Sequence, residues 1–195
     1  MWAMEGDRNR QCRRYPLFSA CGLNCGLCPR YYTEGESRCP GCGGEDFSLK
    51  HPSCGILSCC RRHGQQYCGL CEQYPCNRYE GACLYDSFIT HKNQLIDLGK
   101  AKEYGLDAYE AELDQKVALL KILLADYDDG RKKSFFCLAV NLLDLQDILS
   151  VMGQIADHLG AGDSKKEKAA MAERLFQRAA ESRNIPLKLR KKPTL

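Results

Sequence analysis

Cysteine is the residue type in this chain whose number and spacing can do chemistry. Twelve of its fourteen cysteines lie between Cys21 and Cys83, and they come in groups with short gaps. A gap of two residues lets one tight turn aim two thiolates at the same ion, and several such turns complete a tetrahedral shell. The sequence therefore predicts an N-terminal part that is built around metal.

The candidate metal ligands are the cysteines of these groups. Ten of them form the main set: Cys21, Cys25, Cys28, Cys39, Cys42, Cys54, Cys59, Cys68, Cys71 and Cys76. Ten thiols make two four-coordinate sites with two thiols left over, whereas adding Cys60 and Cys83 gives the count for three sites. We expect two or three zinc ions, and the assignment of individual cysteines to ions stays open. His51 or His63 can replace a thiol in such a site.

Zinc has its best local support at Cys39-Pro-Gly-Cys42-Gly. Proline and glycine between the thiols suit a turn whose backbone N–H groups point at sulfur. Cys25-Gly-Leu-Cys28 and Cys68-Gly-Leu-Cys71 have a similar form. A metal held in this way serves the fold, so the first functional hypothesis is a zinc-stabilised scaffold that acts as an interaction module for a protein partner.

An iron–sulfur cluster is the alternative cofactor, because thiolates at these spacings also hold [4Fe–4S]. The spacing Cys21-x3-Cys25-x2-Cys28 is that of radical S-adenosylmethionine enzymes, and Gly43-Gly44-Glu45 resembles their methionine-binding motif. Nothing in this chain alternates strand and helix as the partial barrel of those enzymes requires. The alternative is therefore electron transfer, or support of a redox enzyme, in an anaerobe.

Charge and motifs argue against other classes. The net charge of +3 is too small for a nucleic-acid-binding surface, so a nucleic-acid-binding zinc protein is only a second alternative. Arginines inside the cysteine-rich part instead suit counter-charges for thiolates: Arg30, Arg38, Arg61, Arg62 and Arg78. No nucleophile elbow or phosphate-binding loop is visible, so we name no catalytic residue and no small-molecule substrate.

The expected location is the cytoplasm, with reduced thiols. The N-terminus has no apolar stretch typical of a secretory signal, and no run is long enough to span a bilayer. A disulfide framework would require an oxidising compartment, and closely spaced cysteine pairs suit it poorly.

The pattern along the chain predicts a mainly α protein with a small metal-stabilised module fused to a helical bundle. We expect a polar arm over 1–16, the cysteine-rich module over 17–85, a helical domain over 86–183 and a basic tail over 184–195. From Cys12 to Cys83 the chain has only seven leucines and isoleucines, so ligand bonds must replace much of the missing apolar core. Arg8, Arg10, Arg13 and Arg14 are expected to be solvated.

Four or five helices are expected after Asp86. The first runs from about His91 to Lys102, and the second has Asp107 and Glu110 as a capping box and ends at Gly130. The apolar segment 134–143 is expected to form a buried helix or helical turn. A further helix is capped by Asp144 and Asp147 and stopped by Gly160 and Gly162, and the last runs from a Ser164–Glu167 capping box to Ser182.

The order of the cysteine groups resembles that of a known family. The resemblance rests on Cys21-Gly-Leu-Asn-Cys25-Gly-Leu-Cys28-Pro29, on Cys39-Pro-Gly-Cys42, on Ser53-Cys54-Gly-Ile-Leu-Ser-Cys59 and on Tyr67-Cys68-Gly-Leu-Cys71-Glu-Gln-Tyr-Pro-Cys76. These strings look like the bacterial and archaeal family named domain of unknown function 3795, and the likeness continues to Cys137. The resemblance implies a metal-binding cysteine-rich protein with no assigned activity. Cys60 and Cys83 depart from the family pattern.

Overall fold

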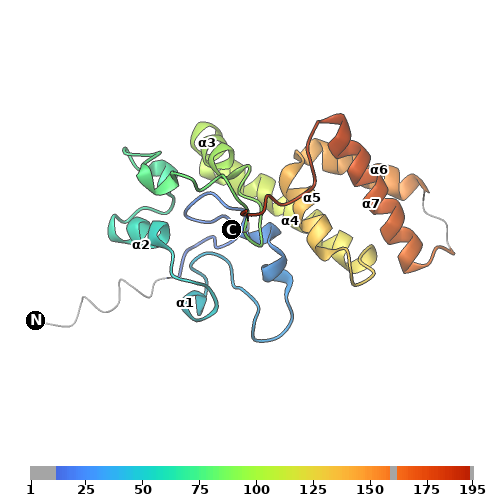
Figure 1. The fold of residues 1–195 in the computed structure, drawn as a ribbon, viewed down its shortest axis with the longest axis horizontal. Helices are drawn as coiled ribbons and strands as arrows, with labels where there is room; N and C mark the ends of the chain where they lie inside the picture. Colours follow the sequence, from blue (N-terminus) through green and yellow to red (C-terminus); the bar gives the residue numbers. More distant parts are fainter. Residues whose placement is uncertain (1–11, 159–161, 194–195) are drawn as a thin grey trace, which may run out of the picture.

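The computed structural model describes residues 12–158 and 162–193, and this part of the chain contains seven α-helices and no strand. Figure 1 shows an elongated molecule with the cysteine-rich segments and the helix Gln94–Tyr104 at one end and the later helices at the other. The predicted mainly helical, cysteine-rich fold is confirmed. The predicted arm falls largely on residues 1–11 and the predicted stop at Gly160 on 159–161, and both lie outside the described residues.

The cysteine-rich part consists of loops and short helical turns. The two α-helices are α1 (Phe47–Lys50) and α2 (Gly55–Arg62), and four single turns of 3-10 helix complete it: η1 (Cys25–Leu27), η2 (Pro29–Tyr32), η3 (Cys68–Leu70) and η4 (Asn77–Tyr79). Both C-x2-C turns with Gly-Leu between the thiols form 3-10 turns, in which the second cysteine amide bonds to the first cysteine carbonyl. Such short elements bury little apolar surface by themselves.

Five longer helices follow: α3 (Gln94–Tyr104), α4 (Leu106–Asp126), α5 (Lys133–Leu142), α6 (Leu145–His158) and α7 (Lys165–Ser182). The capping box that the sequence predicts for α7 is present, because Ser164 and Glu167 exchange side-chain to backbone hydrogen bonds. The buried helix expected over 134–143 is α5. No helix in the described ranges has the length and apolar character needed to cross a membrane.

The predicted capping box of α4 is wrong. Gly105 is the N-cap of this helix, and no side chain caps it. Glu110 instead accepts hydrogen bonds from Tyr67 at 2.7 Å and from Arg14 at 3.0 Å. Its carboxylate therefore binds groups outside α4 and does not cap the helix. The helix also ends at Asp126, before the predicted Gly130.

One buried cluster joins the two parts of the molecule. It includes Phe18 and Leu27 from the cysteine-rich part together with Val117, Val140 and Phe176 from the long helices. η1 packs against α4 and α5, and η3 packs against α3. The cysteine-rich part therefore shares its apolar core with the helices, and its stabilisation by metal stays a prediction.

Two glycines allow the close approach between these parts. Gly22 has a φ of +93°, and a Cβ there would collide with the Gln94 carbonyl and with Leu98 of α3. A Cβ on Gly26 would lie 2.9 Å from Val117 Cγ2 of α4. Larger residues would push the first cysteine turn away from both helices.

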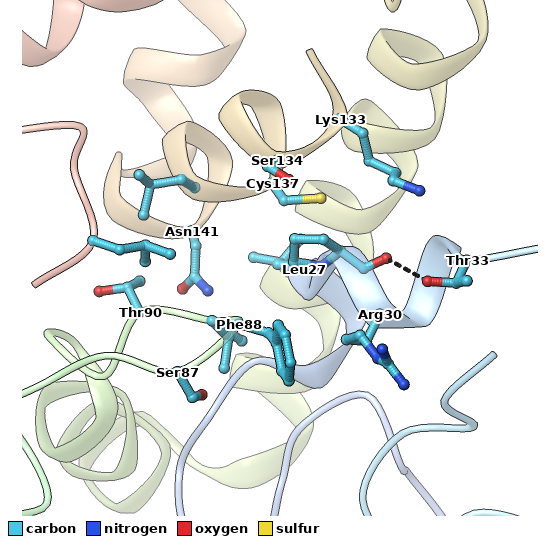
Figure 2. A pocket seen from close by; sticks show the side chains of 14 residues that line it. Leu27, Arg30, Thr33, Ser87, Phe88, Thr90, Lys133, Ser134, Cys137 and Asn141 are labelled. Carbon is cyan, nitrogen blue, oxygen red and sulfur yellow. Dashed lines mark hydrogen bonds between the residues drawn. The ribbon is translucent and has the colours of Figure 1, made fainter. Parts of the chain in front are cut away.

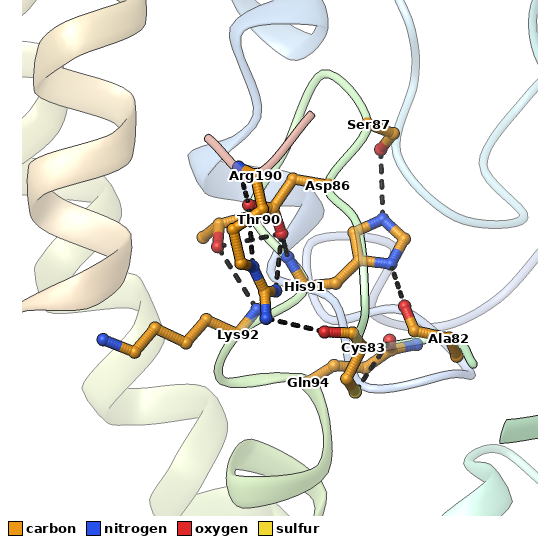
Figure 3. Close-up of polar contacts among 9 residues, drawn as sticks. All are labelled: Ala82, Cys83, Asp86, Ser87, Thr90, His91, Lys92, Gln94 and Arg190. Carbon is orange, nitrogen blue, oxygen red and sulfur yellow. Dashed lines mark hydrogen bonds and ion pairs between the residues drawn. The ribbon is translucent and has the colours of Figure 1, made fainter. Parts of the chain in front are cut away.

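The segment after α7 returns to the cysteine-rich part, as Figure 1 shows. There Arg190 makes an ion pair of 2.7 Å with Asp86, whose side chain is 1% exposed. Arg190 also donates to the carbonyl of Cys83 at 2.6 Å (Figure 3). His91, in the same network, contacts the carbonyl of Ala82 at 2.9 Å and the hydroxyl of Ser87 at 3.1 Å. Arg190 thus anchors the basic tail to the segment 83–86.

Candidate functional site

The cysteines of the N-terminal part gather into two groups. We call the first the Cys25 group; its members are Cys21, Cys25, Cys28, Cys39, Cys42 and Cys54. The charge of Cys25 interacts with four others of the group, and Cys54 is linked to it through Cys21 and Cys42. The sequence predicted these six residues as ligands but left open which of them lie together.

The second set, which we call the Cys68 group, contains Cys59, Cys60, Cys68, Cys71 and Cys76. The charge of Cys68 interacts with Cys76, Cys71 and Cys59, and Cys60 lies close enough to share a hydrogen bond with Cys68. All five line one pocket of about 560 Å³, which His63, Arg62 and Arg78 also border. Cys60 is therefore a member of this group, although it departs from the spacing of the pairs.

Backbone hydrogen bonds hold distant turns together around these groups. The amide of Cys39 donates to the Arg30 carbonyl at 3.0 Å, which brings the Cys-Pro-Gly-Cys turn beside η2. The amide of Cys42 donates to Pro16 at 2.9 Å, and that of Cys68 to Ala20 at 2.8 Å. Residues 16–20 therefore bond to one turn of each group.

Backbone amides lie near several of the sulfur atoms. Those of Arg30 and Tyr31 lower the pKa of Cys28, and that of Ala20 lowers the pKa of Cys42, in each case against the larger effect of burial. Cys54, as the N-cap of α2, accepts from the amide of Leu57 at 3.5 Å. Such bonds stabilise negative charge on sulfur, as they do in thiolate sites that hold metal.

Arg13 lies between the two groups, although the sequence led us to expect it in a solvated arm. Its side chain is only 8% exposed, and it donates to the carbonyls of Phe18 at 2.6 Å and Gln66 at 2.9 Å. Its positive charge lowers the pKa of both Cys42 and Cys60, against the larger effect of burial. One buried guanidinium thus favours the thiolate form of one cysteine in each group. Arg14 pairs with Glu110, but its side chain is 68% exposed, as expected for a solvated arm residue.

The cysteine-rich part also matches a known family. Residues 17–81 match the family described as Protein of unknown function (DUF3795). The resemblance noted in the sequence is confirmed over that segment, and its extension to Cys137 stays a prediction. No curated protein and no solved structure matches the chain. The DUF3795 segment contains every member of the Cys25 and Cys68 groups.

Burial keeps many of these thiols protonated. In the Cys25 group it raises the pKa of Cys21 to about 11 and that of Cys25 well above the ordinary value, and neighbouring thiolates raise both further. In the Cys68 group burial raises the pKa of Cys60 to about 12. A metal ion that binds here must displace these protons, so its affinity rises with pH.

The groups are neighbourhoods of thiols and not finished coordination shells. Within residues 12–158 and 162–193, no three His, Cys, Asp or Glu side chains converge closely enough to hold a metal ion. The chemistry of the donors fits zinc or an iron–sulfur cluster, since each group offers four or more sulfurs. To bind metal, the cysteine side chains of each group would have to rotate so that their sulfur atoms face a single metal centre in that group.

The remaining sequence candidates lie elsewhere. Cys83 is outside the DUF3795 segment, where its thiol lies 4.0 Å from Gln94 and its carbonyl accepts from Arg190. His51 is exposed and stacks on Phe47, with ring centroids 4.5 Å apart. Of the arginines expected as counter-charges, Arg30 lowers the pKa of Cys28 against the larger effect of burial, and Arg62 and Arg78 border the pocket of the Cys68 group.

Proposed function

We propose that this protein binds metal through thiolates at two centres, one in the Cys25 group and one in the Cys68 group. The observation that carries the proposal is the gathering of eleven cysteines into two groups, which each bond through one turn to the segment 16–20 and which share one buried arginine. Two centres correspond to the lower of the two zinc counts expected from the sequence.

For the Cys25 group we propose a structural zinc ion. Two C-x2-C pairs, Cys25–Cys28 and Cys39–Cys42, are brought side by side by the Cys39–Arg30 backbone bond. Four thiolates from two such turns are a common closed zinc set. The longest helix of this part has eight residues, so ligand bonds would supply rigidity that secondary structure does not.

With zinc in a structural role, the protein would act as a scaffold, and its surface would bind a protein partner. The metal stabilises the loops, and no catalytic step passes through it.

For the Cys68 group an iron–sulfur cluster is a second candidate. The observation that favours it is the pocket of about 560 Å³, which is lined by all five cysteines of the group. A cluster of several atoms needs more room than a single zinc ion, and solvent access to it supports electron transfer. Structural zinc at the first centre and a cluster at the second are compatible.

The first test is the metal content of the full chain purified without oxygen. We expect either two zinc per chain, or one zinc with iron and matching acid-labile sulfide and a visible absorption band. Cys42→Ser should remove the metal of the first centre alone, and Cys71→Ser that of the second alone. Cys12→Ser, at an exposed cysteine outside both groups, is the matched control and should keep both metals.

Two results would overturn the proposal. One is a protein that carries no metal when purified without oxygen and takes up none on titration with zinc or iron and sulfide. The other is a Cys42→Ser variant that keeps the wild-type metal content and melting temperature, because the Cys-Pro-Gly-Cys turn would then not be a ligand site.

A further inference from the structure

A second pocket lies beside Cys28 of the Cys25 group, where three parts of the chain meet. It is bounded by the segment 27–33, the segment 87–90 and α5, and Leu189 of the returning tail closes one side. Its volume is about 230 Å³, and most of its wall is apolar, from Leu27, Phe88, Ile89 and Leu138. Figure 2 shows Leu27 and Phe88 in this wall. Only the folded arrangement of all three parts creates it.

The charged residues that line this pocket are Arg30 and Lys133, and both are cations. No carboxylate lines it, and neither cation pairs with a carboxylate in the described part of the chain. Arg30 lies near the thiol of Cys28, and Lys133 lies near that of Cys137; each lowers the pKa of that thiol against the larger effect of burial. The adjacent Lys132, by contrast, makes an ion pair of 2.6 Å with Glu173. Arg30 lies over the ring of Phe88, 5.2 Å from its centroid, which fixes its guanidinium at the edge of the apolar wall.

Polar donors accompany the two cations. Asn141 is 3% exposed; its side-chain oxygen accepts from Asn24 at 3.4 Å, whereas its side-chain nitrogen donates to no group in residues 12–158 and 162–193. Figure 2 shows this amide pointing from α5 toward the segment 87–90. Lys133 and Ser134 are the first two residues of α5, where backbone N–H groups are free and the helix dipole is positive.

We propose that this pocket binds a small organic carboxylate with an apolar body. The apolar walls would take the body of the ligand, and Lys133 with Arg30 would take the carboxylate at one side. A preformed apolar cavity of about 150 Å³ binds benzene, so a pocket of this size holds roughly nine non-hydrogen atoms. An inorganic anion would leave the apolar wall unused, and a neutral ligand would leave two cations without a carboxylate.

The test uses the full, metal-loaded chain and three probes in isothermal titration. Benzoate has the expected size and charge, benzamide has the same body without the charge, and inorganic phosphate has charge without the body. We expect benzoate to bind about tenfold or more tightly than benzamide, because it alone gains charge-assisted hydrogen bonds. Phosphate should bind more weakly than benzoate.

Two variants test the assignment of residues. Lys133→Gln should weaken benzoate binding about tenfold and leave benzamide unchanged, because only the charge of the anchor is lost. Leu138→Trp should fill the pocket and weaken both probes. Lys121→Gln, at an exposed lysine of α4, is the matched control and should bind all three probes as wild type does.

Three outcomes would overturn the proposal. Equal affinity for benzoate and benzamide would show a merely apolar hole, and tighter binding of phosphate would show a simple anion site. No binding of any probe at millimolar concentration would show that the pocket takes no such ligand. Unchanged metal content in the variants separates these results from a failure of the metal centres.

Discussion

The hydroxyl of Tyr109 donates a hydrogen bond of 2.9 Å to the side-chain oxygen of Asn24, the residue immediately before η1. The side-chain nitrogen of the same Asn24 donates to Asp97 Oδ2 at 2.9 Å and to Asn141 at 3.4 Å. One buried amide thus binds α3, α4 and α5 to the first cysteine turn. The position of that turn is set by the helices as well as by any metal.

Replacing Tyr109 with phenylalanine should therefore destabilise the protein even when metal is bound. The change leaves the buried oxygen of Asn24 without this donor, which costs about 1–3 kcal/mol of unfolding free energy. Denaturant unfolding of wild type and Tyr109→Phe, both metal-loaded, measures it. Equal midpoints and slopes would show that the bond contributes nothing.

Asp97 should give the stability a pH dependence opposite to that of an ion-paired carboxylate. Burial, opposed by Lys116 and Lys100, raises the pKa of Asp97 from 3.8 to about 6. Between pH 4 and 6 the native state therefore binds more protons than the unfolded chain, and the unfolding free energy falls as pH rises through that window. Each pKa unit corresponds to about 1.4 kcal/mol, so the fall is roughly 2–3 kcal/mol.

The variant Asp97→Asn isolates this effect. It keeps an oxygen that can accept from Asn24 but has no charge to bury, so its stability should exceed that of wild type above pH 6 and approach it near pH 4. The difference between the two proteins at each pH removes the shared dependence of thiol–metal bonds. Parallel curves from pH 4 to 7 would contradict the buried, titrating Asp97.

Removing Arg190 should release the returning tail. Burial of Asp86 is outweighed by hydrogen bonds from Arg190 and from the His91 amide, which lower the pKa of Asp86 to about 2. Without Arg190 that carboxylate stays buried without its counter-charge, a change that costs about 3–5 kcal/mol. Arg190→Ala should raise hydrogen exchange in 184–193 and lower the melting temperature. Lys191→Ala, at an exposed neighbour, should change neither, and equal behaviour of both variants would refute the assigned anchor.

Arg13 should matter to both cysteine groups. Arg13→Met leaves the carbonyls of Phe18 and Gln66 without their donor and removes the positive charge beside Cys42 and Cys60. We expect a loss of about 2–4 kcal/mol and slower uptake of metal at both centres. Arg14→Met, which removes an exposed arginine next in sequence, should have a much smaller effect. A variant Arg13→Met that loads both centres at the wild-type rate would exclude a role for its charge.

The sequence predicted the helices well where their signals are local. The capping box of Ser164 and Glu167 and the apolar run 134–143 are short-range patterns, and α7 and α5 lie where those patterns place them. The same kind of signal failed at Asp107 and Glu110, because Tyr67 and Arg14 from the cysteine-rich part take the Glu110 carboxylate. A local pattern carries no information about that distant partner.

The identity of the candidate ligands could be read from spacing, but their grouping could not. Cys54 follows the Cys-Pro-Gly-Cys turn by twelve residues and joins the Cys25 group, whereas Cys59, five residues later within α2, joins the Cys68 group. The burial of Arg13 depends on carbonyls at Phe18 and Gln66 that meet only in the folded chain. Long-range backbone contacts decide both features.

The ion pair between Asp86 and Arg190 spans 104 residues of chain, and α3 through α7 lie between its two ends. During synthesis, Asp86 leaves the ribosome long before Arg190. The intervening helices are therefore made while the Asp86 carboxylate, which is buried in the folded protein, still has no counter-ion. A nascent chain therefore passes through a stage in which its helices can pack but Asp86 stays hydrated. Closing so long a loop costs little more entropy than closing a shorter one. The segment around Arg190 can dock on Asp86 only after the intervening helices have been made, so its docking is a late step.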